Sequence, residues 1–498
     1  MTTNECFIGI DVGLTSAKAA AFGTDGSEIL TVAMPNPREA SRGGRQEIDM
    51  AALWRVVAQV LRELTAGLAA RGYVPSAVGA TGHGNGLYLV DDDLRPVRAA
   101  IASNDNRAES IVARLDAATI AREHRVTGSM PWAGQPAVLL AWLAQNEPES
   151  VDRATWVLSC KDWITTNLTG APSADLSDAS ACGLVDLEHR SYAPSTLDNL
   201  GLSRALREKF PPLSASGDVV GAVTASAASS TGLPLGIPVV AGCMDCVASP
   251  LGAGSTNPSD VTIIVGTWAI NSVVVPADAA PPRVTLNALL PDPRYMLAQE
   301  VAPTSAASIE WFASMMSSTS IDGLSPRDLL HAASTVPAGA DGLLFLPFIN
   351  GAPDHLGASG TFIGAQAHHG YREFARAVAE GITQYHRVQL EKLQSTAAVT
   401  DAPWTLAGGG AKNPVWAQMF ADVIGHPVRR QLGTELGARG VASLAAGAAG
   451  LDVSRWISDP DPALVVRPGT DRLSYLTQNR RFDAALAALD SVWTAAAS

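Results

Sequence analysis

A pattern of two strands around a tight glycine turn occurs twice in this chain, and it constrains the fold more than any other feature. The segment FIGIDVGLTSAKAAAF (residues 7–22) alternates apolar and polar positions on both sides of residues 13–16, which is typical of a β-hairpin. About half a chain later, VTIIVGTWAINSVVV (residues 261–275) repeats the pattern around Gly266. We therefore predict an internally duplicated chain.

Strand-like and helix-like segments alternate between and after these hairpins, which indicates an α/β fold class. Residues 50–68 carry apolar side chains at helical spacing, and residues 76–81 are strand-like. Residues 371–388 and 411–425 are further expected helices. A chain of 498 residues exceeds what one hydrophobic core usually supports, so we expect two domains. The Ala/Ser-rich stretch at 222–230 suggests a boundary, giving domains 1–230 and 231–498.

The charge and the cysteines narrow the classes of partner and the compartment. A formal net charge of -13 disfavours binding to nucleic acid and to anionic membrane surfaces. No apolar stretch is long enough to span a bilayer, and the N-terminal segment does not have the pattern of a signal peptide. Five cysteines are an odd and sparse set, which fits a reducing compartment, and we expect a cytoplasmic protein. A homodimer and a monomer both stay open.

The two hairpins have the residue types of a phosphate site. Backbone N–H groups and hydroxyls bind phosphate oxygens, and Asp11 is placed to hold Mg²⁺ through water. The alternative is an ordinary hairpin in which Asp11 caps a turn. Two such turns would hold a phosphate chain from both sides. The candidate phosphate ligands are Gly13, Thr15, Ser16, Lys18, Gly266 and Thr267.

A glycine-rich turn in AGGGAKNPVWAQMFADVIG is a third candidate for nucleotide binding. Gly408, Gly409 and Gly410 permit close backbone approach to a base or a phosphate. Asn413 is the expected helix N-cap, with Pro414 at the first helical position. The alternative is a strand-to-helix turn of plain α/β packing.

The segment PVVAGCMDCVAS places Asp245 between a strand and the start of a helix. A carboxylate there is suited to take the proton of a substrate hydroxyl as its oxygen attacks a γ-phosphorus. One alternative is a helix cap. Another is a redox or zinc site at Cys243 and Cys246, although no second cysteine pair completes the ligands that zinc requires.

The segment ATGHGNGLYLVDDD exposes His83 and Asn85 between glycines, and residues 103–107 follow another apolar segment. Both segments are candidates for binding sugar hydroxyls, and Asp105 is the candidate residue of the second segment. The alternatives are a turn that faces solvent and a solvated helix start. The chain has no G-x-x-x-x-G-K-[ST] loop, no full G-x-G-x-x-G opening a helix and no G-x-S-x-G elbow, so phosphate binding is expected from the hairpins.

Over nearly its whole length, the chain resembles the FGGY carbohydrate kinases. IGIDVGLTSAKA and IIVGTWAI are similar to the two phosphate hairpins of that family, AGGGAKNPVWAQMFADVIG to its adenosine segment, and GCMDCVAS to the segment that carries the catalytic aspartate. GTFIGAQAHHGYREFARAVAEG resembles its C-terminal signature, with Ala365 and Ala379 in place of larger apolar residues. The resemblance implies two actin-like ATPase (ribonuclease H-like) domains with a nucleotide cleft between them, and ATP and Mg²⁺ as cofactors. The first domain would bind sugar and the second ATP.

The resemblance also assigns roles to residues. It implies Asp245 as the base and as a substrate contact, Asp11 for the metal, and His83, Asn85 and Asp105 for the sugar. TGHGNGLYLVD with SNDNRA is most similar to the L-xylulose kinase-like branch, in which a small residue, here Ser103, replaces a tryptophan. The segment PNPREASRGGRQEIDM is also similar to erythritol kinases. The expected function is transfer of the γ-phosphoryl group of ATP to a small ketose or polyol, with xylulose first and a tetritol as the alternative. A chaperone-like ATPase on the same fold and a thiol-redox protein are the rivals from other classes.

Overall fold

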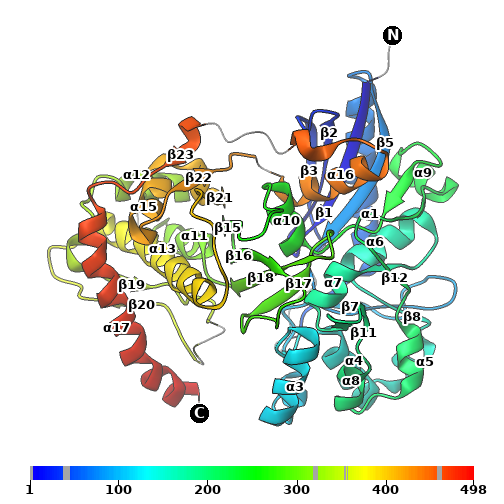
Figure 1. The fold of residues 1–498 in the computed structure, drawn as a ribbon, viewed down its shortest axis with the longest axis horizontal. Helices are drawn as coiled ribbons and strands as arrows, with labels where there is room; N and C mark the ends of the chain where they lie inside the picture. The colour runs from blue at the N-terminus through cyan, green and yellow to red at the C-terminus, as the bar shows by residue number, and fades with distance from the viewer. Residues whose placement is uncertain are drawn as a thin grey trace. The chain divides into compact units, whose positions relative to one another are not determined.

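The computed structural model describes residues 4–37, 45–317, 324–352, 355, 357–433, 435–456 and 462–497. Helices and strands alternate along the chain (Figure 1), as the sequence predicts for an α/β protein. The chain divides into two compact units. The first comprises residues 1–256, 275–297 and 435–458, and the second comprises residues 257–274, 298–434 and 459–498. No helix in the described ranges is long and apolar enough to cross a bilayer.

The first unit does not end at residue 230, where the sequence suggested a boundary. Strand β14 (Pro238–Val240) lies in its sheet, parallel to β5 (Tyr73–Gly82). Helix α16 (Leu436–Ala448) returns from much later in the chain and packs on β1 (Asn4–Val12). The Ala/Ser-rich stretch contains helix α9 (Ala225–Thr231), which packs against α1 (Met50–Ala69) and does not form a linker. Residues 38–44, part of the segment similar to erythritol kinases, lie outside the described residues.

The sheet of the first unit has the strand order β13-β14-β5-β1-β2-β3. Strand β1 pairs antiparallel with β2 and parallel with β5, so the predicted first hairpin is present. The other strands of this sheet are β2 (Ser16–Gly23), β3 (Glu28–Pro35) and β13 (Val219–Ala222). Shorter strands of the same unit are β4 (Glu47–Ile48), β6 (Tyr88–Val90), β7 (Ala100–Ile101), β8 (Trp156–Leu158), β9 (Ala174–Asp175), β10 (Val185–Asp186), β11 (Ser191–Tyr192), β12 (Leu213–Ser214) and β17 (Leu286–Leu289).

Helices cover both faces of β1, which explains why the strand is apolar at nearly every position. On one face, Ile8 and Ile10 pack with Leu53 and Leu61 of α1 (Met50–Ala69), the helix predicted at residues 50–68. On the other face, Phe7 packs with alanines of α16. The remaining helices of this unit are α2 (Glu109–Val112), α3 (Ala117–Thr127), α4 (Pro136–Asn146), α5 (Pro148–Arg153), α6 (Cys160–Thr169), α7 (Leu176–Ala181), α8 (Pro194–Asn199) and α10 (Asp245–Gly252).

The second unit repeats this plan. Strands β15 (Val261–Val265) and β16 (Ala269–Pro276) form the predicted second hairpin, and β21 (Trp404–Gly408) lies parallel to β15. The sheet continues with β18 (Tyr295–Ala302) beside β16, and with β22 (Val428–Arg430) and β23 (Val465–Val466) beyond β21. A hairpin followed by a parallel strand therefore forms the centre of both sheets, as the predicted duplication requires.

Helices of the second unit follow the sequence prediction with one difference. Helix α13 (Tyr371–Thr396) includes the residues predicted as helical at 371–388. The helix expected at 411–425 is divided at Asn413, because Asn413 caps the start of α15 (Pro414–Ile424) and ends α14 (Gly409–Lys412). The other elements are α11 (Ala306–Ser317), α12 (Pro326–Ala333), α17 (Arg472–Ala497), β19 (Leu344–Leu346) and β20 (Thr361–Ile363).

Candidate active site

Three parallel strands of the first unit end at the same edge of its sheet, and each is followed by a candidate residue. Asp11 lies near the end of β1, where Val12 pairs with Gly82 of β5. The backbone N–H of His83 donates to the carbonyl of Val12 over 2.8 Å. Asp245 follows β14, the strand on the other side of β5. Open α/β sheets bind ligands at this edge, beyond the carboxyl ends of the strands.

Asp11 lies in a cluster of charged groups at this edge. Burial raises the pKa of Asp11 to about 6, where the charge of Lys18 lowers it and that of Glu435 raises it. Lys18 Nζ is 3.2 Å from Glu435 Oε2, so its charge is already shared with that carboxylate. A β-carbon at Gly437 would lie 2.5 Å from Asp11 Oδ2, which shows how closely the first turn of α16 approaches the carboxylate.

Asp245 is the first residue of helix α10 and Met244 is the N-cap, whereas the sequence analysis placed Asp245 in the turn before the helix. The backbone N–H of Cys246 donates to Asp245 Oδ1 over 2.7 Å. The pKa of Asp245 is raised to about 8, mainly by burial. The negative charges of Asp11 and Asp178 also raise it, and the effect of Asp11 is the larger of the two. The charge of Asp11 therefore disfavours ionisation of Asp245, as a like charge in one site does.

The sugar loop contains two buried polar atoms that have no hydrogen-bond partner in the described part of the chain. His83 Nε2 lies 2.9 Å from the Tyr88 hydroxyl, whereas His83 Nδ1 and Asn85 Oδ1 are buried with no hydrogen-bond partner among the described residues. Burial lowers the pKa of His83 to about 4, so its ring is neutral near pH 7. Asn85 has a left-handed backbone (φ 58°), a conformation that asparagine tolerates better than most residues.

The loop that carries His83 and Asn85 lies against the Asp245 turn. The methyl end of the Met244 side chain occupies the space where a β-carbon would stand at Gly84. Only glycine leaves room for this contact. Met244 immediately precedes Asp245, so the two sequence motifs are adjacent in space.

Asp105 is in the same unit, but both of its oxygens are occupied. Oδ2 accepts the N–H of Gln46 over 2.6 Å, and both oxygens accept from the Arg107 guanidinium over 2.8 Å. Its side chain is fully buried. A direct contact with a sugar would require one of these bonds to break. Arg107, which belongs to the same predicted segment at residues 103–107, also bonds Glu47 over 2.8 Å, and its Nη1 is buried with no hydrogen-bond partner among the described residues.

The turn of the first hairpin is held by Asn36. Gly13 N–H donates to the Ser16 carbonyl over 3.0 Å, which closes the turn. Asn36 donates from its side chain to the Gly13 carbonyl over 2.6 Å and from its backbone to the Thr15 carbonyl over 3.0 Å. Thr15 is exposed at the tip. The sequence analysis missed Asn36, because its partners are 21 and more residues earlier in the chain.

In the second unit, the other phosphate turn and the glycine-rich turn are neighbours. Val265 pairs with Gly408, which places Gly266 beside Gly409. Gly408 has φ 77°, and a β-carbon there would lie 2.5 Å from the Val265 carbonyl oxygen. Thr267 is exposed. The predicted N-cap is present, because Asn413 Oδ1 accepts the N–H groups of Val415 and Trp416.

A buried ion network near Asp245 was not found from the sequence. Lys161 Nζ lies 2.5 Å from Asp162, 2.8 Å from Asp175 and 3.8 Å from Asp178. Burial alone would lower the pKa of Lys161, but the three carboxylates outweigh it and hold the pKa well above its usual value. The sequence does not reveal this network, because its members come together only when α6 and α7 pack in the folded chain.

The five cysteines are free and buried. Burial raises the pKa of both Cys243 and Cys246 well above the usual value, and nearby carboxylates raise it further. Neither thiol is therefore ionised near pH 7, and thiolate is the form that reacts and binds metals.

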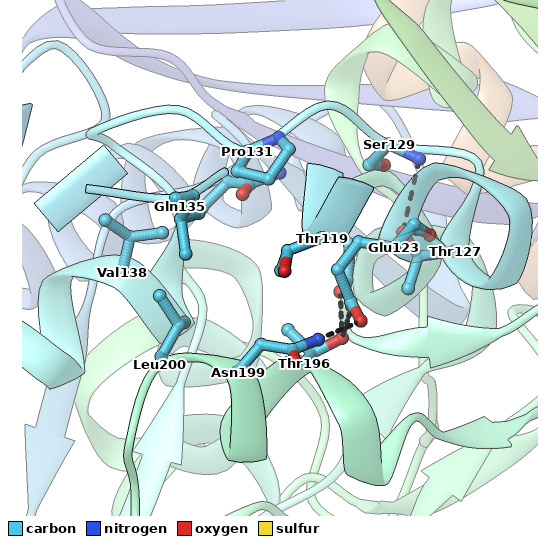
Figure 2. Close-up of a pocket in the computed structure, with 12 residues that line it drawn as sticks. Thr119, Glu123, Thr127, Ser129, Pro131, Gln135, Val138, Thr196, Asn199 and Leu200 are labelled. Carbon is cyan, nitrogen blue, oxygen red and sulfur yellow. Dashed lines mark hydrogen bonds between the residues drawn. The ribbon is translucent and has the colours of Figure 1, made fainter. Parts of the chain in front are cut away.

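A separate pocket of the first unit lies beside α3 and α8. Figure 2 shows Glu123 pointing toward Thr196 and Asn199, which donate to its carboxylate over 2.9 Å and 2.5 Å. The residues that line this pocket include none of the predicted site residues. Its buried carboxylate is satisfied by the chain itself.

Comparisons with known proteins agree with the predicted family. Models of the N-terminal and C-terminal domains of the FGGY family of carbohydrate kinases match residues 6–252 and 261–449. The chain is 30% identical over 440 residues to the L-xylulose/3-keto-L-gulonate kinase of Escherichia coli strain K12, covering 88% of this chain and 86% of the relative. It is 30% identical over 472 residues to the erythritol kinase of Brucella abortus strain 2308, covering 90% and 88%.

Solved structures confirm the predicted fold class of two actin-like ATPase domains. The xylulose kinase of Rhodospirillum rubrum superposes with a TM-score of 0.85 at 27% identity, covering 98% of this chain and 100% of that one. Family models that match most of the chain, and relatives at 30% identity over most of its length, show that this chain belongs to the FGGY family of carbohydrate kinases and is an ATP-dependent sugar kinase.

Proposed function

We propose that this kinase phosphorylates a small uncharged ketose or polyol, with a pentulose such as xylulose as the first candidate and a tetritol such as erythritol as the second. The observation that carries the proposal is a pair of buried polar atoms without hydrogen-bond partners among the described residues, His83 Nδ1 and Asn85 Oδ1. They lie on the loop that Met244 contacts beside Asp245. Buried polar atoms without partners are costly, and a sugar hydroxyl both donates and accepts, so it would satisfy the amide oxygen and either tautomer of the imidazole. The names of the relatives favour sugars of four or five carbons.

A sugar acid is a weaker candidate, although one relative is named for a keto-gulonate. Arg107 Nη1 is a buried cationic donor that makes no hydrogen bond to any residue that the structure describes. However, Asp105 and Glu47 both bond this guanidinium, and Glu47 is also paired with Arg98, so the charge of Arg107 is already neutralised by carboxylates. This balance disfavours a substrate carboxylate.

Asp245 is the proposed base. Its carboxylate takes the proton of one sugar hydroxyl, the freed oxygen forms a bond to the γ-phosphorus of ATP, and the bond to the ADP oxygen breaks. With a pKa of about 8, Asp245 is mostly protonated near pH 7, so the base acts from its ionised fraction, which increases as the pH rises toward 8. His83, Asn85 and Asp105 complete the proposed sugar site, Asp105 by holding Arg107 and the backbone of Gln46.

Asp11 is the proposed residue for Mg²⁺. Burial raises the pKa of Asp11 to about 6 and that of Asp245 to about 8, and a nearby divalent cation would favour the ionised form of both groups. Carboxylate oxygens are also the ligands that Mg²⁺ prefers, which supports the proposal. When bound, Mg²⁺ neutralises charge on the phosphates. Asp11 would hold it, with Glu435 and Lys18 balancing the local charge.

The turns supply the proposed nucleotide contacts. In the first unit these are Gly13, Thr15, Ser16 and Lys18. Lys18 would give up its ion pair with Glu435 and bind a phosphate. In the second unit, Gly266 and Thr267 are proposed for phosphate, and Gly408, Gly409, Gly410 and Asn413 for adenosine. Action in the cytoplasm, where ATP is available and thiols stay reduced, fits the five free cysteines.

A coupled ADP-release screen tests the proposal. The panel contains D- and L-ketopentoses, tetritols, glycerol, hexuloses and matched sugar acids, with wild type, Asp245→Asn and the exposed-loop control Asp92→Asn. We expect ADP release with a four- or five-carbon uncharged sugar in wild type and in the control only. Release without any sugar would support an ATPase module instead, and release with sugar acids alone would overturn the assigned substrate class.

A further inference from the structure

One end of the β19–β20 pair in the second unit brings together two loops that are far apart in sequence. Leu344 pairs antiparallel with Ile363, so the turn before β19 and the loop after β20 lie at the same end. The backbones approach closely there, because a β-carbon at Gly364 would lie 2.9 Å from the Gly342 carbonyl oxygen. The first loop carries Asp341 and the second carries His368 and His369.

The turn that carries Asp341 has an unusual backbone. Gly339, Ala340, Asp341 and Gly342 have φ angles of 96°, 46°, 52° and 87°. Successive left-handed residues other than glycine are costly and persist only where their surroundings hold them. Here Gln478 donates to the Gly339 carbonyl over 2.7 Å, and Arg481 donates to the Gly342 carbonyl over 2.8 Å. The position of Asp341 is therefore fixed from both sides.

Both imidazoles are directed at the Asp341 carboxylate. His368 Nε2 lies 2.7 Å from Asp341 Oδ2, and His369 Nε2 lies 3.7 Å from the same oxygen. One ligand atom from each of the three residues falls within 4.8 Å of the others. His368 and Asp341 are exposed, with 57% and 64% of their side chains accessible, so a solute can reach them.

His369 contributes the observation that points to a ligand. Its side chain is fully buried, and Nε2 makes no hydrogen bond to any described residue. A buried polar atom without a partner costs free energy unless something else satisfies it. Asp341 Oδ2 faces this nitrogen but is too distant for a hydrogen bond.

We propose that Asp341, His368 and His369 form a binding site for a borderline divalent cation of the Zn²⁺ class, with the fourth position open to water. Two imidazole nitrogens and one carboxylate oxygen are a ligand set that Zn²⁺ accepts, with ligand atoms about 2 Å from the metal. Imidazole does not suit Mg²⁺. The site is distinct from the proposed catalytic groups of the first unit, and it would join the strained turn to the start of α13.

The proton on His369 sets how tightly the site binds. His369 Nδ1 accepts the N–H of Gln366 over 3.1 Å, so the proton of the neutral ring is on Nε2. Coordination through Nε2 moves this proton to Nδ1 and gives up the Gln366 bond. His368 and Asp341 therefore provide the first contacts, and His369 joins at the cost of one backbone hydrogen bond.

Calorimetric titration of the full chain with Zn²⁺, in excess Mg²⁺ to occupy oxygen-ligand sites, tests the proposal without using activity. We compare wild type with the exposed-residue variants His368→Gln and Asp341→Asn. The matched control is His189→Gln, because His189 is also an exposed histidine paired with an aspartate, at 2.9 Å from Asp186, but it belongs to no such cluster among the described residues. Circular dichroism confirms folding, and Co²⁺ in place of Zn²⁺ reports tetrahedral coordination by its visible absorption.

We expect one Zn²⁺ binding event in wild type and in His189→Gln. The Zn²⁺ affinity should fall about tenfold or more in His368→Gln and in Asp341→Asn, because removing a ligand should cost at least as much affinity as removing a residue that only supports one. The Co²⁺ bands should disappear in the same two variants. Equal affinity in wild type and in His368→Gln would overturn the proposal, as would the absence of Zn²⁺ binding in wild type.

Discussion

Replacing Asp245 with asparagine should stabilise the first unit while removing turnover. The carboxyl group has a pKa of about 8 in the folded chain against an ordinary value of 3.8, because it is buried beside Asp11. A raised pKa means that the folded state keeps this proton up to a higher pH than the unfolded state does. Between pH 3.8 and 8 the stability contributed by the group therefore falls as pH rises. Asparagine keeps the shape and never ionises, so it avoids this loss.

The size of the gain follows from the pKa difference. At pH 7, about three pH units above the ordinary pKa of 3.8, the group is ionised in the unfolded chain but mostly protonated in the folded chain. For a fully enclosed group this difference lowers the free energy of unfolding by about 4 kcal/mol. Asp245 keeps an opening to solvent, so screening reduces the gain to about 1–3 kcal/mol. The gain should vanish near pH 4 and grow up to about pH 8. Turnover should fall about a hundredfold or more, the usual range for losing a general base.

Hydrogen exchange followed by mass spectrometry measures this change in one unit at a time. Peptides from β5 and α10 should exchange about five- to a hundredfold more slowly in Asp245→Asn at pH 7. Peptides from α13 in the second unit provide the internal reference, and Asp92→Asn controls for a lost surface charge. Protection that is unchanged or lower at pH 7 would refute the charge argument. Equal extra protection at pH 4 would attribute the effect to packing instead.

Two further substitutions test the sugar loop. Asn85→Gly keeps the left-handed backbone but removes the buried amide oxygen, so KM for the sugar should rise about tenfold, the worth of one hydrogen bond, with ATP affinity by calorimetry unchanged. An unchanged KM would remove Asn85 from the sugar site. Gly84→Ala introduces a β-carbon into the space of the Met244 methyl group, so turnover should fall, and adding Met244→Ala should restore part of it. Without that recovery, the Gly84 and Met244 contact does not control the position of Asp245.

Local patterns were enough to predict the parts of the fold that depend on neighbours in sequence. The alternation around Gly13 and Gly266 predicted both hairpins, and β1 with β2 and β15 with β16 have that arrangement. The helical spacing after Met50 predicted α1 for the same reason. The Asn413-Pro414 pair predicted the N-cap of α15, although not the break between α14 and α15.

Long-range contacts account for what the sequence did not predict. Glu435 and Gly437 lie beside Asp11, from which more than 400 residues separate them, and no local signal connects them. The expected boundary at residue 230 differs from the observed units for this reason. Helix α16 covers one face of a sheet whose strands come from the other end of the chain. Asp105 illustrates a different limit. An acid in a polar loop suggests a ligand, but its pairing with Arg107 is fixed by side-chain directions that spacing does not reveal.

Close packing of small residues is what allows Asp245 to stay near the like charge of Asp11. Helices α10 and α16 approach through backbone atoms, because a β-carbon at Gly440 would overlap the Ala248 carbonyl oxygen and one at Gly252 would overlap that of Leu436. Asp245 begins the first of these helices, and the start of the second lies against Asp11. The free energy of this packing offsets the cost of burying Asp245 near a like charge. A residue larger than glycine at 440 would therefore separate the helices, lower the pKa of Asp245 by admitting water, and weaken the base together with the fold.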